Sequence, residues 1–172
     1  MGKVWKYGDG IDTDLIFAGK YTYTLRDPEE IAARALEDLD PTFATQVQAG
    51  DVVVAGRNFG NGSSREQAVT CLKYKGIAGV IAKSFARIYF RNGINQGLLL
   101  ITCPDAVEAA QRGDQIEIDL PNSLVRLNGQ PYPFPPLSPT AQGMIEAGGL
   151  ISHIRKKLGL TATEEVKVAS GE

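Results

Sequence analysis

The sequence predicts an α/β fold with a mixed, partly parallel β-sheet and flanking helices. Three short apolar runs, at residues 51–55, 79–82 and 97–102, lack the alternation of a half-exposed strand, so each is expected to be buried on both faces. Helical patterns at residues 64–74 and 85–92 separate these runs. Strands that alternate with helices in this way are typical of β-α-β units, whose strands are parallel.

The N-terminal part is predicted to hold one short strand, a long connection and one helix. Residues 4–7 form the candidate strand. The connection that follows is rich in Gly and Asp but also in aromatic residues, so we expect it to pack on the rest of the protein. The helix is expected to begin after Asp27, because Pro28 suits a first helical position, and to continue at helical spacing to Leu39.

The C-terminal half changes to an antiparallel meander. Apolar and polar residues alternate over residues 112–134, and two Asn-containing pairs within this stretch are turn signals. The proline-rich stretch 131–139 excludes a helix or a central strand. A final helical region, capped by Ser138 or Thr140, is expected to break at a Gly-Gly pair and to end near Lys157.

Length and composition indicate one domain. A chain of 172 residues, 43% hydrophobic, can bury one core, which we expect over residues 1–160. Residues 161–172 have little to bury and are expected to be disordered. The net charge of -2 gives no reason to expect nucleic acid or an anionic membrane as a partner, and no apolar run is long enough to cross a bilayer.

The two cysteines, Cys71 and Cys103, are too few for a four-thiolate metal site. We expect them to be buried, reduced thiols in a cytoplasmic protein. No metal ligands are predicted in this chain.

The Gly- and Ser-rich segment NFGNGSSREQA, at residues 58–68, is the strongest candidate for a functional site. Ser63 and Glu66 fit a capping box, in which the serine oxygen accepts from a free backbone N–H. The glycines allow close approach of a ligand, and a helix N-terminus favours an anion. Arg65 opposes the helix dipole, which a paired carboxylate ligand would explain. The residues alone therefore predict an anion site, without a reaction.

Several other site types are excluded. The segment lacks the Gly-Lys-Ser/Thr ending of a P-loop, and its glycines do not follow the G-x-G-x-x-G pattern of a dinucleotide site. The sole histidine, His153, stands among basic residues of the last helix and is expected at the surface, so it does not suit a Ser-His-Asp triad. If Ser63 acts as a base, a group other than an internal histidine must activate it.

Three motifs together resemble a known family. They are GRNFGNGSSREQA followed by GVIAKSFARIYFRNGINQGLLLI, the N-terminal GDGIDTDLIFAGKY and the C-terminal GGLISHIRKKLG. Over about residues 3–160 the chain resembles the small subunits of the two-subunit hydro-lyases of the aconitase superfamily, such as 3-isopropylmalate dehydratase. The resemblance implies a swivelling β/β/α domain like the fourth domain of aconitase. It also implies leucine biosynthesis, and a [4Fe-4S] cluster held by a separate large subunit.

The resemblance implies roles for the residues of the serine loop. Ser63 resembles the catalytic base, which as an alkoxide removes the proton beside a carboxylate while the hydroxyl leaves toward the cluster iron of the partner. Ser64 and Arg65 resemble residues that hold a carboxylate of a small di- or tricarboxylate substrate, and Gly62 is a further candidate for substrate binding in the same loop. A helix N-terminus would favour both functions.

Four charged residues elsewhere are secondary candidates. Asp12 and Asp14 are typical turn residues, and the resemblance places them at the mouth of the site, facing the large subunit. Arg87 and Arg91 are four residues apart and share a helical face. We favour a structural role for these arginines, orienting the serine loop, over substrate binding.

The resemblance assigns substrate choice to the loop after Tyr21. Relatives that act on homoaconitate-type tricarboxylates carry an arginine two residues later, where this chain has Tyr23. A tyrosine suits an apolar branch, so we favour 3-isopropylmalate. Homoaconitate and methyl-substituted malates stay open, because Arg26 could fold into the pocket. A non-catalytic anion-binding or assembly module is the alternative of another class, and self-association of the isolated chain is also left open.

Overall fold

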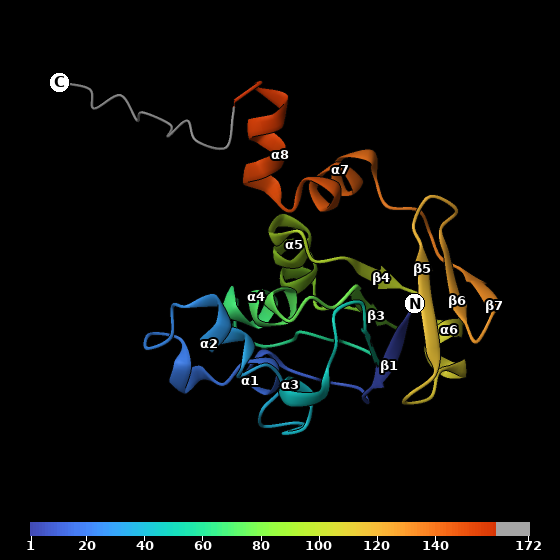
Figure 1. Ribbon diagram of the computed structural model, residues 1–172, viewed down its shortest axis with the longest axis horizontal. Helices are drawn as coiled ribbons and strands as arrows, with labels where there is room; N and C mark the ends of the chain where they lie inside the picture. Colours follow the sequence, from blue (N-terminus) through green and yellow to red (C-terminus); the bar gives the residue numbers. More distant parts are fainter. Residues whose placement is uncertain (161–172) are drawn as a thin grey trace.

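The protein is built on one mixed sheet. The computed structural model describes residues 1–160 (Figure 1), so the expected disorder of 161–172 falls outside the described residues. Seven strands lie in the order β4-β3-β2-β1-β5-β6-β7. The predicted mixed, partly parallel sheet with flanking helices is confirmed.

The parallel half contains four strands, β1 (Gly2–Lys6), β2 (Val52–Ala55), β3 (Gly79–Ala82) and β4 (Leu100–Thr102). The three buried apolar runs of the sequence are β2, β3 and β4, as predicted. The strand β4 is shorter than expected, because Gly97 adopts a left-handed conformation (φ 79°) and ends the preceding helix instead of beginning the strand.

The antiparallel half is the predicted meander of β5 (Gln115–Asp119), β6 (Leu124–Leu127) and β7 (Gln130–Pro133). The strand β5 pairs with β1, which therefore has a parallel neighbour on one side and an antiparallel neighbour on the other. The prolines of β7 are tolerated because β7 is the edge strand, where a missing N–H breaks no central ladder.

Two apolar clusters cover the two faces of the parallel strands. Neighbouring residues on β1 divide between them: Trp5 belongs to the cluster under the N-terminal helices, and Val4 to the cluster under the meander. This division follows from the pleat, which points successive side chains to opposite faces. Cys71 and Cys103 are both buried free thiols, one in each cluster.

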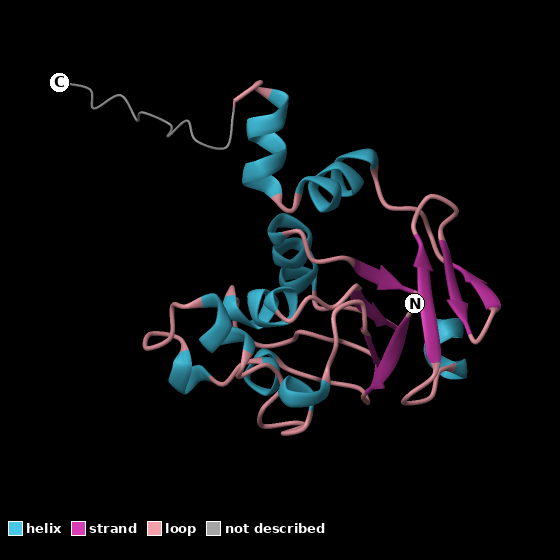
Figure 2. Cartoon of the chain, viewed as in Figure 1, coloured by secondary structure: helices cyan, strands magenta, loops and turns pink. Residues whose placement is uncertain are grey.

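Most helices pack on one face of the parallel strands, while α6 lies on the other face beside the meander (Figure 2). The sequence did not predict α6, nor the short helices at residues 13–16, 19–21 and 43–46. The described helices are α1 (Thr13–Ile16), the 3-10 helix η1 (Gly19–Tyr21), α2 (Pro28–Ala32), α3 (Phe43–Gln46), α4 (Gln67–Tyr74), α5 (Arg87–Gln96), α6 (Pro104–Ala109), α7 (Pro139–Ala147) and α8 (Leu150–Lys157). None of them is long and apolar enough to cross a membrane.

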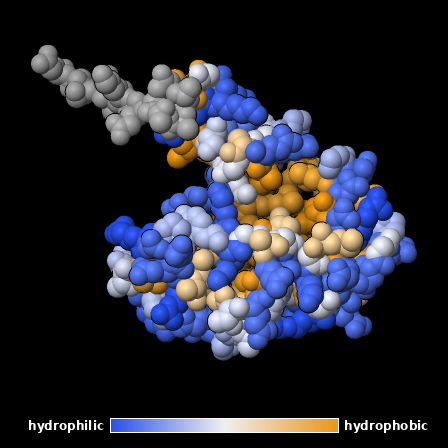
Figure 3. Space-filling view, viewed as in Figure 1, coloured by the Kyte–Doolittle hydropathy of each residue, from blue (hydrophilic) through white to orange (hydrophobic). Residues whose placement is uncertain are grey.

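The C-terminal helices follow the sequence signals closely. Ser138 caps α7 by accepting from the N–H of Ala141 at 3.2 Å, and α8 begins after the Gly-Gly pair. His153 is half-buried against Gly143 rather than fully at the surface as expected. Hydrophobic residues gather in the hollow between α5, α7 and the strands (Figure 3), where the α5–α7 groove is lined in part by Phe90, Ile94 and Met144.

Candidate active site

The candidate site is assembled from three loops that follow the carboxyl ends of β1, β2 and β3. Isolated backbone bridges join Asp12 to Asn61 and Phe59 to Phe85, so that the second loop is held between the first and the third. The carboxyl ends of parallel strands are where α/β folds place ligands. The sequence separates these loops by dozens of residues, and the sheet order brings them together.

Two glycines shape the serine loop. Gly60 has a φ of 81°, and a Cβ there would lie 2.1 Å from the Cγ of Tyr89. Gly62 has a φ of 96°, and a Cβ there would lie 3.1 Å from the Oγ1 of Thr13. Both positions therefore need glycine for conformation, and Gly60 also needs it for space. Tyr89 is buried and its hydroxyl donates to the carbonyl of Ala68 at 2.9 Å, which fixes α5 to α4 beneath this loop.

The predicted capping box at Ser63 is wrong. The helix α4 begins at Gln67, and its N-cap is Glu66, which makes no side-chain cap hydrogen bond. The Glu66 carboxylate instead accepts from Nε2 of Gln96 at 2.6 Å and ties the loop to α5. Ser63 therefore does not cap the start of α4.

The Ser63 hydroxyl lies in a setting suited to an anion. Its Oγ is 3.3 Å from the Oγ1 of Thr13. Among residues 1–160, neither the backbone N–H of Ser63 nor that of Ser64 has an acceptor within the protein. Free N–H groups just before a helix are donors for a carboxylate or an oxyanion. The Ser64 hydroxyl accepts weakly from Nδ2 of Asn92 at 3.4 Å.

Arg65 is held beside Ser63 by the first loop. Its Nη1 lies 2.5 Å from Oδ1 of Asp14 and donates to the carbonyl of Phe17 at 3.0 Å. Only 18% of the Arg65 side chain is exposed, whereas that of Asp14 is 66% exposed. The hydrogen bond from Arg65 holds the pKa of Asp14 below its usual value. Asp12 caps α1 by accepting from the N–H of Leu15 at 2.9 Å, so it has a structural task.

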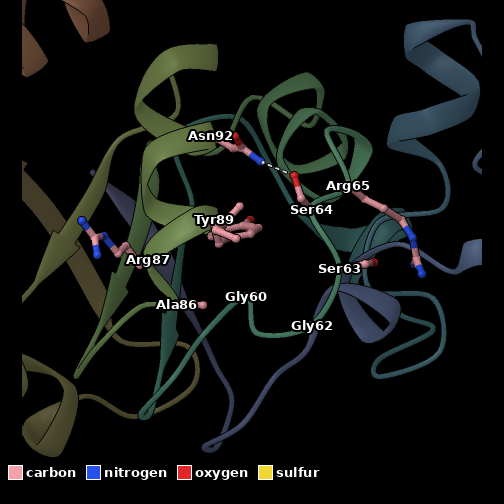
Figure 4. A pocket seen from close by; sticks show the side chains of 10 residues that line it. Gly60, Gly62, Ser63, Ser64, Arg65, Ala86, Arg87, Tyr89 and Asn92 are labelled. Atoms are coloured by element: carbon pink, nitrogen blue, oxygen red, sulfur yellow. Dashed lines mark hydrogen bonds between the residues drawn. The ribbon is translucent and has the colours of Figure 1, made fainter.

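The side chains of the serine loop divide between two directions. Ser63 and Arg65 point away from Tyr89, and Ser64 points toward Asn92 (Figure 4). A pocket of about 210 Å³ lies on the Tyr89 side and is lined by Gly60, Gly62, Ser63, Ser64, Arg65, Ala86, Arg87, Ile88, Tyr89 and Asn92. The Ser63 and Arg65 side chains therefore lie on the α1 side of the loop. The pocket on the opposite side is lined mainly by the loop and α5.

Arg87 and Arg91 were expected to orient the serine loop, but within residues 1–160 neither forms an ion pair with it. Arg87 lines the pocket but points away from Ser63 (Figure 4), and Arg91 lies in the groove between α5 and α7. Neither makes an ion pair within residues 1–160. The supporting contacts from α5 come from Tyr89, Asn92 and Gln96, and the contact from α1 comes from Thr13. The sequence patterns did not predict these four residues.

The two candidates for substrate choice are both exposed. Tyr23 is 86% exposed just after η1, while Arg26 is exposed on a separate shallow pocket that Gln67 and Tyr74 help to line. Gln67 fixes this loop by donating from Nε2 to the carbonyl of Thr22 at 3.1 Å. No hydrogen bond or ion pair within residues 1–160 connects Arg26 to the serine loop.

The side chains of residues 1–160 do not fit a resident metal site. Within residues 1–160, no three His, Cys, Asp or Glu side chains come together as metal ligands. The two cysteines lie in separate clusters, and burial raises the pKa of each thiol, which disfavours the thiolate form that binds iron.

The family model for the aconitase C-terminal domain matches residues 13–106, which is more than half of the chain. The match includes the second and third loops of the site and the first loop from Thr13 onward. The chain belongs to this family. Among its relatives, a 3-isopropylmalate dehydratase small subunit from Thermodesulfovibrio yellowstonii is 45% identical, over 96% of this chain and 98% of that protein. A protein of the same name from Nautilia profundicola is 48% identical, over 91% and 95%.

A solved structure agrees with this aconitase-family assignment. The crystal structure of a 3-isopropylmalate dehydratase from Methanocaldococcus jannaschii superposes with a TM-score of 0.86. It is 42% identical and covers 91% of this chain and 93% of that chain. The match thus includes both halves of the sheet as well as the loops that carry the site.

Proposed function

We propose that this chain is the small subunit of a two-subunit 3-isopropylmalate dehydratase, a hydro-lyase of leucine biosynthesis. The enzyme would interconvert 2-isopropylmalate and 3-isopropylmalate by dehydration and rehydration. The observation that carries the proposal is the pairing of an exposed Ser63 with Arg65 on a loop with free N–H groups. The 45–48% identity to small subunits of that name, over more than nine-tenths of the chain, supports the substrate assignment.

Ser63 would act as the base of the dehydration. In its ionised form Ser63 removes the proton from the carbon next to a carboxylate, and in the reverse direction it returns a proton to the double bond. The free N–H groups of Ser63 and Ser64 stabilise negative charge at this position. The field of the loop and the start of α4 lowers the cost of forming the alkoxide, and the proposal assigns no histidine to this step.

Arg65 would hold the substrate carboxylate through its planar fork. Asp14 and the Phe17 carbonyl both contact one nitrogen, Nη1, so they fix the direction of the guanidinium. Arg65 lies two residues after the base and on the same side of the loop (Figure 4). A carboxylate bound to Arg65 would therefore lie beside the carbon that Ser63 deprotonates.

The cluster would belong to the partner. We place the [4Fe-4S] cluster on a large subunit, since the two cysteines of this chain cannot converge on one metal site. This chain contributes the base and the carboxylate-binding residues. Its two buried free thiols fit a reducing cytoplasm, where we place the complex.

The first prediction tests the two-subunit reading. Purified alone, the chain is expected to be folded, without iron–sulfur absorbance and without dehydratase activity. Mixed anaerobically with the cluster-bearing large subunit, it is expected to turn over 3-isopropylmalate, measured as formation of the unsaturated diacid. Turnover by the lone chain would contradict the proposal. Tight carboxylate binding with no turnover of any substituted malate by the pair would instead favour a non-catalytic anion-binding module.

The second prediction concerns the branch of the substrate. Tyr23→Arg is expected to raise kcat/KM for the tricarboxylate homoaconitate, relative to 3-isopropylmalate, by about tenfold or more, because an arginine offers a paired site to a carboxylate that is costly to bury alone. The loop is suited to this test because Gln67 fixes it at Thr22. The measurement compares both substrates with the large subunit present.

The matched control is Arg26→Ala. Arg26 is exposed on a separate shallow pocket, so its removal should leave 3-isopropylmalate turnover unchanged. If the wild type prefers homoaconitate and Arg26→Ala abolishes that preference, Arg26 folds into the assembled site and the substrate assignment changes. An equal ratio of kcat/KM for the two substrates in the wild type and both variants would mean that this loop does not determine which substrate branch is accepted.

A further inference from the structure

Thr13 is a buried polar residue that points at the proposed base. It is the first residue of α1 and only 2% exposed. Its backbone is fixed at both sides, since its N–H donates to the carbonyl of Asn61 at 2.8 Å and its carbonyl accepts from the N–H of Phe17 at 2.9 Å. Its Oγ1 lies 3.3 Å from the Oγ of Ser63, and no other hydrogen-bond partner of this hydroxyl is present within residues 1–160.

We propose that Thr13 is a positioning residue for Ser63. The Thr13 hydroxyl donates a hydrogen bond to the Ser63 oxygen and holds it in the reactive orientation. The proposal rests on the proposed role of Ser63 as the base. A buried hydroxyl needs a partner, because leaving it unpaired costs free energy. Ser63 is the partner that the fold supplies, and an ionised Ser63 can only accept.

The distance favours a contact that strengthens during the reaction. An O–H···O bond between neutral groups is normally 2.5–3.0 Å long, so 3.3 Å is a loose contact. When the acceptor becomes ionised, such bonds shorten to about 2.5–2.7 Å and become roughly twice as strong. An interaction that is stronger in the reacting state than in the resting state increases kcat.

Gly62 keeps the two hydroxyls within reach. A Cβ at this position would lie 3.1 Å from the Oγ1 of Thr13, so a side chain there would press on the hydroxyl itself. The Asp12–Asn61 bridge and the Thr13–Asn61 hydrogen bond fix the serine loop against the start of α1. Thr13 and Ser63 thus belong to one rigid junction, although 50 residues separate them in the chain.

The test uses Thr13→Val and Thr13→Ser, each combined with the large subunit. Valine keeps the branched shape and removes the hydroxyl, while serine keeps the hydroxyl. Thr13→Val is expected to lower kcat about ten- to a hundredfold, the loss of one hydrogen bond to a charged group, with KM within about twofold. The ascending, acidic limb of its kcat–pH profile, along which Ser63 loses its proton, should move to higher pH, since the alkoxide loses a donor. Thr13→Ser should restore most of both.

The double variant Ser63→Ala/Thr13→Val, compared with each single variant, shows whether a negative result contradicts the role of Thr13 or the role of Ser63. In Ser63→Ala, adding Thr13→Val should cause no further loss of kcat, because the two residues act as a unit. An inactive Ser63→Ala together with full kcat in Thr13→Val would overturn the role of Thr13 and leave the base assignment intact. Equal losses in Thr13→Val and Thr13→Ser without a pH shift would also overturn it. Full activity of Ser63→Ala would overturn the assignment of the base itself.

Discussion

Ser63→Ala, combined with the large subunit, is expected to lose turnover by about a hundredfold or more, because a positioned base of general acid–base catalysis contributes at least that much. Its free energy of unfolding should fall by about 1 kcal/mol, because Ser63 caps no helix but its removal leaves the buried Thr13 hydroxyl without its described partner. The measurements are steady-state turnover of 3-isopropylmalate and chemical denaturation of the isolated chain.

Ser138→Ala is the matched control, because Ser138 is a serine that does cap a helix. Loss of its bond to the N–H of Ala141 should lower the free energy of unfolding by about 1 kcal/mol, with turnover unchanged. The two variants should therefore lose similar amounts of stability but differ in turnover. If Ser63→Ala kept its turnover as Ser138→Ala does, Ser63 would be a structural residue only.

The contrast between these two serines shows what local sequence rules can decide. Both were candidate caps, and the rule is right for Ser138 and wrong for Ser63. At Ser138 the proline at the next position begins the helix immediately. At Ser63 the chain makes a tight turn instead, in which the N–H of Arg65 donates to the Ser63 carbonyl at 2.9 Å, and the helix begins only at Gln67. Gly60 and Gly62 bring this loop against Tyr89 and Thr13. Contacts distant in sequence override the local pattern there.

The sheet was predictable because its strands are short, apolar and bounded by turn residues. The limits of β3 agree with the sequence, and those of β2 differ by one residue. The N-terminal helix was overestimated for a physical reason: Leu36 has a φ of 55°, so the chain leaves the helical conformation after Ala32 although the apolar spacing continues. Burial of the Leu36 side chain in the core offsets the free-energy cost of its positive φ. No local feature of the sequence indicates this conformation.

The site was predictable in its chemistry but not in its geometry. Gly, Ser and Arg before a helix indicate an anion site, and the family resemblance added the reaction. The sequence could not say that Asp14 would fix Arg65, or that Thr13 would meet Ser63, because both contacts span about 50 residues and depend on the order of β1 and β2. The one usable signal was the Asp-Thr-Asp motif itself, whose central residue is the buried one.

Arg65→Lys is expected to lower kcat/KM for 3-isopropylmalate by about a hundredfold, the equivalent of one to two hydrogen bonds to a charged group. Lysine keeps the positive charge but lacks the planar fork, so it can neither bind a carboxylate in a bidentate manner nor keep the anchor to the Phe17 carbonyl in the same geometry. A second measurement needs no activity. The pKa of Asp14, which the hydrogen bond from Arg65 lowers, should rise toward its usual value in the variant, as followed by NMR titration of the carboxyl group.

Arg34→Lys provides the matched control for this substitution. Arg34 pairs with Glu37 at 2.9 Å on the surface, three residues apart in the chain, and an exposed pair of this kind contributes little. Its kcat/KM should stay within about twofold of wild type. If Arg65→Lys behaved like Arg34→Lys in kcat/KM while the pKa of Asp14 rose as expected, Arg65 would organise the first loop without binding substrate. The carboxylate would then have to be held by the N–H groups of Ser63 and Ser64, the other donors at this loop.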